Sequence, residues 1–144
     1  MKLLEHFDHP ERKQDKEHFI HLIQIASADG IIDDSELRML NQIGKNLGLT
    51  DAEIKDLFDT SKQSAYNPPY ELTKRFEQLY RVIQMILADE NIANEEIHLA
   101  KILGLKSGFS DDELTILLPL LIDGIRGGQD EEDLFVLYKK RRKA

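Results

Sequence analysis

The sequence predicts an all-α protein, a compact bundle of about seven helices built from an internal duplication. Three observations lead to this prediction. One segment of the chain occurs twice, with an offset of 60 residues. Apolar residues recur at helical spacing, and no segment alternates convincingly as a strand would. Two capping-box sequences, Thr50-x-x-Glu53 and Ser110-x-x-Glu113, mark helix starts at equivalent places in the two copies.

The duplicated segments are residues 22–57 and 82–117, which align without a gap. Identical residues in the two copies are Ile23 and Ile83, Gln24 and Gln84, Ala28-Asp29 and Ala88-Asp89, Ile32 and Ile92, Glu36 and Glu96, Gly44 and Gly104, Gly48 and Gly108, Asp51 and Asp111, Glu53 and Glu113, and Leu57 and Leu117. With only two copies, the protein is expected to close on itself rather than form an open solenoid. We expect the copies to superpose as helical hairpins related by an approximate twofold axis.

Periodicity and capping residues place the helices of the first half. The expected helices are residues 2–8, 14–29, 34–47 and 50–62. Pro10 would stop the first of them, and Gly30 would cap the second in the left-handed conformation. Gly48 would end the third.

The second half repeats this plan. The expected helices are residues 70–88, 94–106, 110–125 and 130–142. Asn67-Pro68-Pro69 separates the two copies, because proline restricts the residue before it and cannot continue a helix. Gly127-Gly128 would end the helix that begins at the second capping box.

Length and composition favour one globular domain. A chain of 144 residues, 41% of them hydrophobic, is long enough to bury a core, so we expect a single domain over residues 1–144. The repeat copies would cover residues 14–62 and 70–126, followed by a C-terminal helix at 130–143. The absence of cysteine excludes disulfides, thiolate zinc sites and a cysteine nucleophile.

The charge and hydropathy of the chain bear on partners and location. A formal net charge of −8 argues against nucleic acid as a partner, because its phosphates would be repelled. No apolar run approaches the length of a membrane span, and the first residues are not apolar enough for a signal peptide. We therefore expect a cytoplasmic protein.

Both copies place acidic residues where one expected helix ends and the next begins. We name residues 29–36 the first acidic corner and residues 89–96 the second acidic corner. In the first, Asp33 and Glu36 have the spacing of an N-cap and the third helical residue, which predicts that they cap the following helix.

Asp29 and Asp89 are harder to explain by capping. Each stands at the expected end of a helix, where a carboxylate faces the negative end of the helix dipole. Two interpretations stay open for both residues. They accept N–H bonds from the start of the next helix, or they bind a cation.

The acidic corners also carry a family resemblance. An apolar helix ends in Ala28-Asp29-Gly30 and is followed by an Ile, an acidic pair, Glu-Leu, and a later Leu-Gly-Leu before a capped helix. With these features, residues 14–126 resemble the TerB-like family of tellurite-resistance and stress-response proteins. They are also similar to the N-terminal region of membrane-anchored DnaJ-like co-chaperones. The resemblance implies an all-helical, internally duplicated fold.

The resemblance further implies a divalent-cation site, because acidic corner residues of this family have been proposed to bind metal. Carried over to this sequence, the metal ligands are Asp29, Asp33 and Glu36 in the first acidic corner and Asp89 and Glu96 in the second. The second copy departs from this pattern. Ala93 stands at the position equivalent to Asp33, and Glu90 replaces the glycine of the corner.

Two further features have alternative interpretations. The histidine pairs His6/His9 and His18/His21 have helical spacing, which suits metal binding, a structural role or simple exposure to solvent. The basic run at residues 139–143 complements the dipole of the last helix, or it contacts anionic lipid or an acidic partner. The second alternative would give a weak membrane-surface contact.

No P-loop, nucleophile elbow or dinucleotide fingerprint is present. The sequence therefore favours a non-enzymatic domain, and the resemblance implies a TerB-like, stress-response domain that binds a protein partner. Its acidic corners would take a divalent cation or a basic surface. The alternatives are a metal-dependent enzyme with clustered carboxylates and a structural adaptor whose acids only cap helices.

Overall fold

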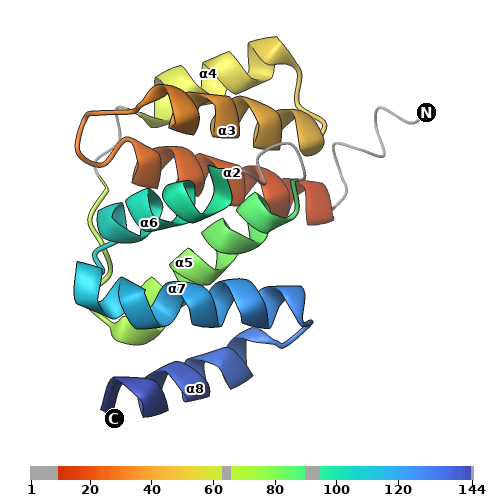
Figure 1. The fold of residues 1–144 in the computed structure, drawn as a ribbon. Coiled ribbons are helices and arrows are strands. Elements are labelled where there is room, and N and C mark those ends of the chain that lie inside the picture. The colour runs from red at the N-terminus through yellow and green to blue at the C-terminus, as the bar shows by residue number, and fades with distance from the viewer. Residues whose placement is uncertain (1–9, 63–65, 90–94, 144) are drawn as a thin grey trace. The chain divides into compact units, whose positions relative to one another are not determined.

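The computed structural model describes residues 10–62, 66–89 and 95–143. Over these ranges the chain forms seven helices and no strand, which confirms the all-α prediction. The expected helix at residues 2–8 lies outside the described residues. The helices are α2 (Pro10–Ala26), α3 (Asp34–Asn46), α4 (Asp51–Ser61), α5 (Leu72–Leu87), α6 (Glu96–Lys106), α7 (Asp111–Arg126) and α8 (Glu131–Lys143) (Figure 1).

The chain divides into two compact units. Unit 1 comprises residues 1–66 and contains α2, α3 and α4, and unit 2 comprises residues 67–144 and contains α5 to α8. The boundary falls at Asn67-Pro68-Pro69, the segment expected to separate the two copies. A single domain over residues 1–144 stays a prediction.

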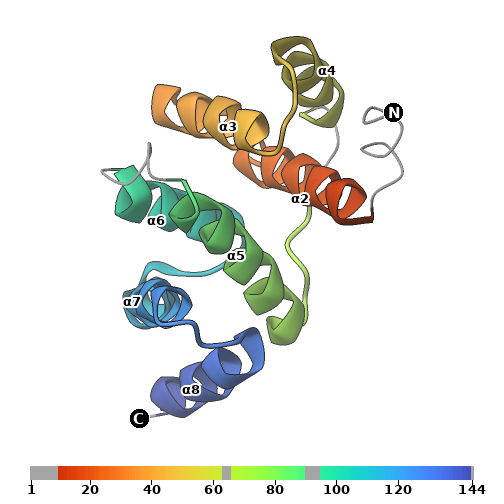
Figure 2. The same cartoon turned by 90° about the vertical axis from the view of Figure 1, so that its right-hand side faces the viewer.

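The three helices of unit 1 each contact the other two (Figure 2). Its buried apolar residues are Phe19, Leu22, Ile23, Ile25 and Ala26 of α2, Met39, Leu40 and Ile43 of α3, Leu49, and Ile54 of α4. A Cβ atom at Gly44 would lie 2.7 Å from Cγ1 of Ile54. Glycine at this position therefore lets α3 and α4 approach closely.

In unit 2, α8 completes the core that α5, α6 and α7 begin. It packs against both α5 and α7. Leu134 and Tyr138 of α8 are fully buried, and the rings of Phe76 and Phe135 lie 4.9 Å apart between centroids. The apolar side of α8 is thus used inside unit 2.

Local features of unit 1 recur in unit 2 at the 60-residue offset. A Cβ at Gly104 would lie 2.6 Å from Cδ2 of Leu114, which repeats the contact of Gly44 with Ile54. Gly108 is left-handed, as the corresponding glycine of unit 1 is. Glycine is suited to both roles because it has no Cβ. The superposition of the two copies about a twofold axis stays a prediction.

The bounds of α2 differ from the expected 14–29. The helix begins at Pro10 because proline suits the first turn, where its missing N–H leaves no bond unmade. It ends at Ala26, and residues 27–29 form a turn that leads into Gly30, at φ 76°. Asp29 therefore follows the helix rather than ending it.

Candidate functional site

The turn after α2 fixes the start of the first acidic corner. Gly30 donates its N–H to the carbonyl of Ser27 at 2.9 Å, and Asp29 Oδ1 accepts the N–H of Ile31 at 3.0 Å. This bond agrees in kind with the expectation that Asp29 accepts an N–H, but the donor belongs to the connection and not to the next helix. The carboxylate therefore holds the turn in shape.

Asp33 and Glu36 form a capping box at the start of α3. Asp33 Oδ1 accepts the N–H of Glu36 at 2.8 Å, and Glu36 Oε1 accepts the N–H of Asp33 at 3.2 Å. The hydroxyl of Ser35 also donates to Asp33 Oδ1, at 2.7 Å. Glu36 is buried. The predicted capping role of Asp33 and Glu36 is confirmed.

An apolar side chain stands among the acids of the first corner. Ile31 is 68% exposed, and its acidic neighbours Asp29, Asp33 and Asp34 are also exposed. The corner thus exposes one large apolar side chain in a segment that also exposes three acids, and Asp29 and Asp33 fix its backbone by hydrogen bonds. Nothing in the sequence pattern distinguished Ile31 from the buried isoleucines, because it lies in the connection between two periodic segments.

The second acidic corner is organised differently. Asp89 and Glu96 are both buried. Glu96 Oε1, in the first turn of α6, accepts a hydrogen bond from Nη2 of Arg126, in the last turn of α7. A partly buried carboxylate needs such a partner, so Glu96 has a structural role. Arg126 lies 30 residues from Glu96, and periodicity gave no signal for this pair.

The five predicted metal ligands fall into these two settings. Asp29, Asp33 and Glu36 belong to unit 1, and Asp89 and Glu96 belong to unit 2. Among the residues that the structure describes, no three Asp, Glu or His side chains are grouped as a metal site would need. Metal binding therefore stays a prediction.

A groove in unit 1 is a feature that the sequence did not predict. It has a volume of about 190 Å³. It is lined by Phe19 and Ile23 of α2, Leu37, Leu40 and Asn41 of α3, and Asp51, Ile54, Lys55 and Phe58 of α4. Leu37 of α3 is 38% exposed and belongs to the lining of this groove.

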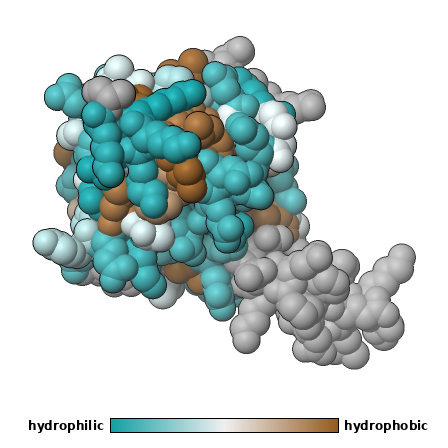
Figure 3. All heavy atoms as spheres, turned by 90° about the horizontal axis from the view of Figure 1, so that it is seen from below, coloured by the Kyte–Doolittle hydropathy of each residue, from teal (hydrophilic) through white to brown (hydrophobic). Residues whose placement is uncertain are grey.

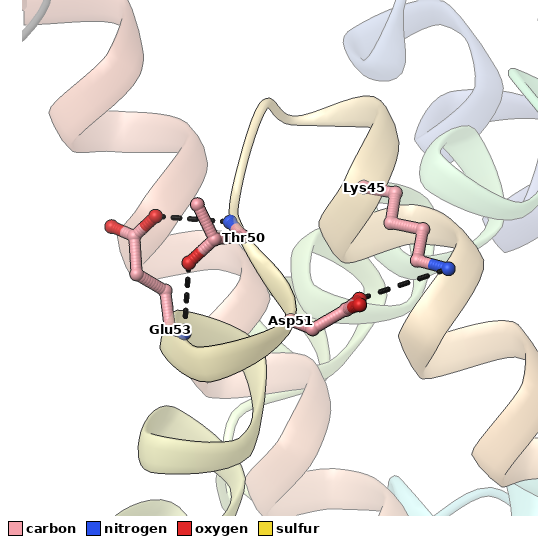
Figure 4. A network of polar contacts seen from close by, with 4 residues as sticks. All are labelled: Lys45, Thr50, Asp51 and Glu53. Atoms are coloured by element: carbon pink, nitrogen blue, oxygen red, sulfur yellow. Dashed lines mark hydrogen bonds and ion pairs between the residues drawn. The ribbon is translucent and has the colours of Figure 1, made fainter.

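The connection from α3 to α4 holds one wall of the groove in place. Thr50 and Glu53 exchange the two hydrogen bonds of the predicted capping box, at 2.9 and 3.1 Å (Figure 4). Lys45 Nζ lies 3.7 Å from Asp51 Oδ1 across the same connection. Exposed pairs of this kind add little stability, so the capping box is the stronger constraint.

His21 of α2 packs against an aromatic ring of unit 1. His21 is half-buried, and its ring meets the ring of Tyr66 edge to face, at 6.0 Å between centroids. Burial, and secondly the charge of His18, lower the pKa of His21. His6 and His9 lie outside the described residues.

A pH dependence follows from this environment. Because the folded protein resists protonation of His21 and the unfolded chain does not, the free energy of unfolding should fall as the pH drops below about 6.5. Urea denaturation at pH about 7.5 and about 5 should show this loss, and His21→Phe should show less of it. An equal loss in the variant would contradict the assignment to His21.

Comparison of the chain with protein-family models, curated proteins and solved structures gave no match. Within the described ranges, no helix is long and apolar enough to cross a membrane.

Proposed function

We propose that this chain is a non-enzymatic binding domain of the TerB-like, stress-response type, and that its first acidic corner receives a basic segment of a protein partner. The observation that carries the proposal is Ile31, an isoleucine 68% exposed among Asp29, Asp33 and Asp34. A basic segment with an apolar residue would match both the charge and the apolar group of this surface.

The fixed backbone of the corner supports the proposal. Asp29 and Asp33 each hold a backbone N–H, so the surface is formed before a partner arrives. Preformed surfaces lose less conformational entropy on binding. The second acidic corner offers less negative charge to a basic partner, because Asp89 and Glu96 are buried and Glu96 is paired with Arg126.

The net charge of −8 would favour association with a basic partner. A divalent cation is the rival ligand of the same corner. It is less well supported, because the described residues contain no group of three potential ligands. Its binding would also have to leave the capping bonds of Asp33 and Glu36 in place.

The test uses a fluorescent peptide of alternating lysine and leucine, with affinity measured by anisotropy. Asp29→Asn with Asp34→Asn should weaken binding about tenfold, because two exposed charges are lost while the amide oxygen of Asn can still accept the N–H of Ile31. The matched control is Asp56→Asn with Asp112→Asn, which removes two exposed helical acids elsewhere. Equal weakening in both double variants would show only a general charge effect and contradict the proposal.

A second pair of variants tests the apolar contact. Ile31→Ala should weaken peptide binding several-fold with little change in stability, because the side chain is 68% exposed. Ile97→Ala removes an isoleucine that is 66% exposed in α6 and should leave binding unchanged. Calorimetric titration with calcium, magnesium, manganese and zinc salts completes the test. If a metal salt gives a heat of binding that Asp29→Asn abolishes, and the peptide does not bind, the ligand of the first acidic corner is a cation and not a basic partner.

A further inference from the structure

The C-terminal half of α8 gathers positive charge on an acidic protein. The chain has 27 Asp and Glu against 19 Lys and Arg, and five of those cations are consecutive. We name Lys139, Lys140, Arg141, Arg142 and Lys143 the basic end of α8. All five are exposed. The acids of α8 lie in its first turn, so the helix has opposite charges at its two ends.

The basic end lacks carboxylate partners among the residues that the structure describes. Elsewhere, lysines such as Lys45 and Lys101 lie 3.7 Å from aspartates. Within the basic end, Lys139 lies over the ring of Phe135 at 4.6 Å, and Arg142 lies over the ring of Tyr138 at 5.6 Å. These contacts orient two cations without neutralising them.

Two of the three acids in the first turn of the neighbouring helix α7 already have partners. Asp111 lies 3.7 Å from Lys101, and Glu113 Oε1 accepts the N–H of Ser110 at 2.9 Å. The dipole of α8 accounts for about half a unit charge at its end, which is much less than five cations supply. The positive charge of the basic end therefore exceeds the negative charge that the helix dipole and nearby acids supply.

The arrangement of the cations indicates the shape of the partner. Consecutive helical residues are about 100° apart around the axis, so five of them encircle the helix rather than form a stripe. Leu134 and Tyr138 of α8 are buried in unit 2 and Val136 is 48% exposed, so the helix offers no continuous apolar face for insertion. Seen from the side where Figure 1 draws α8, hydrophilic residues surround a smaller hydrophobic area (Figure 3).

We propose that the basic end of α8 binds the headgroups of an anionic phospholipid surface by electrostatic attraction. A flat anionic surface can meet cations that surround a helix end. A nucleic acid strand that ran along α8 would reach its acidic first turn, at the opposite end of the helix, where it would be repelled. Clusters of four to eight basic residues on a helix are typical of binding to acidic lipid.

The experiment is co-sedimentation of the full chain with vesicles of phosphatidylcholine mixed with phosphatidylglycerol, and with phosphatidylcholine alone. The triple variant Lys140→Gln, Arg141→Gln, Lys143→Gln should lower the partition coefficient on the order of 100-fold on the mixed vesicles. This variant keeps Lys139 and Arg142, and therefore their contacts with the rings of Phe135 and Tyr138. Added salt should release the intact protein, because exposed charges are screened.

The matched control is the triple variant Lys45→Gln, Lys55→Gln, Lys101→Gln, which removes three cations that lie beside aspartates. It should partition nearly as the intact protein does. Thermal melting of both triple variants checks that each is folded. The proposal is overturned if the intact protein does not sediment with the mixed vesicles at low salt, if both triple variants lose binding equally, or if the protein binds duplex DNA more tightly than the vesicles. These outcomes are independent of the first acidic corner.

Discussion

Phe76→Ala should lower the free energy of unfolding of unit 2 by about 3–5 kcal/mol, the usual range for removing a buried phenylalanine. Phe76 is buried, and its ring lies 4.9 Å from that of Phe135 and 6.0 Å from that of Tyr138, between centroids. The substitution would leave a cavity where α5 meets α8. Loss of these contacts should also weaken the attachment of α8.

Urea denaturation followed by circular dichroism measures the loss, and hydrogen exchange shows which helices are affected. Amides of α5 and α8 should lose protection more than those of unit 1. The control is Phe58→Ala, which removes the same side chain from a half-buried position in α4 and should cost about 1 kcal/mol. Equal losses for the two variants would contradict the assigned core.

Gly108→Ala should cost about 2–4 kcal/mol, for two reasons that add. The residue has φ 99°, where side chains are strained, and a Cβ there would lie 2.7 Å from Cβ of the rigid ring of Pro68. Its carbonyl also accepts a hydrogen bond from Arg75 at 3.0 Å, so the backbone is held in place.

Gly30→Ala separates the two causes. Gly30 is also left-handed, at φ 76°, but among the described residues no atom outside its two chain neighbours lies within 4 Å of a Cβ built on it. This variant should cost only about 1–2 kcal/mol, the strain alone. Denaturation midpoints of the two variants give the comparison. A cost at Gly30 as large as that at Gly108 would show that the contact with Pro68 is unimportant.

Local sequence rules predicted the parts of the fold that depend on local interactions. The capping boxes at Thr50 and Ser110 and the left-handed conformation of Gly30 follow from chain neighbours within a few residues. The repeat of Gly44 at Gly104 became understandable only in the structure, where both glycines allow close approach of neighbouring helices.

The site was less predictable because its features depend on burial and on distant residues. Glu36 and Glu96 are equivalent in sequence, yet Glu36 caps α3 while Glu96 pairs with Arg126, 30 residues away. The exposure of Ile31 depends on how the turn before it is folded. Helical periodicity carries no information on either point.

The central claim, that the first acidic corner is an interaction surface, is tested most directly by NMR mapping of the bound peptide. Amide shifts of the isotopically labelled full chain would be followed as the alternating lysine–leucine peptide is added. The account predicts that the largest shifts fall on Gly30, Ile31 and Asp34, and that Asp29→Asn with Asp34→Asn reduces them. Saturable shifts centred on the second acidic corner or on other helices, with residues 29–36 unchanged, would contradict it.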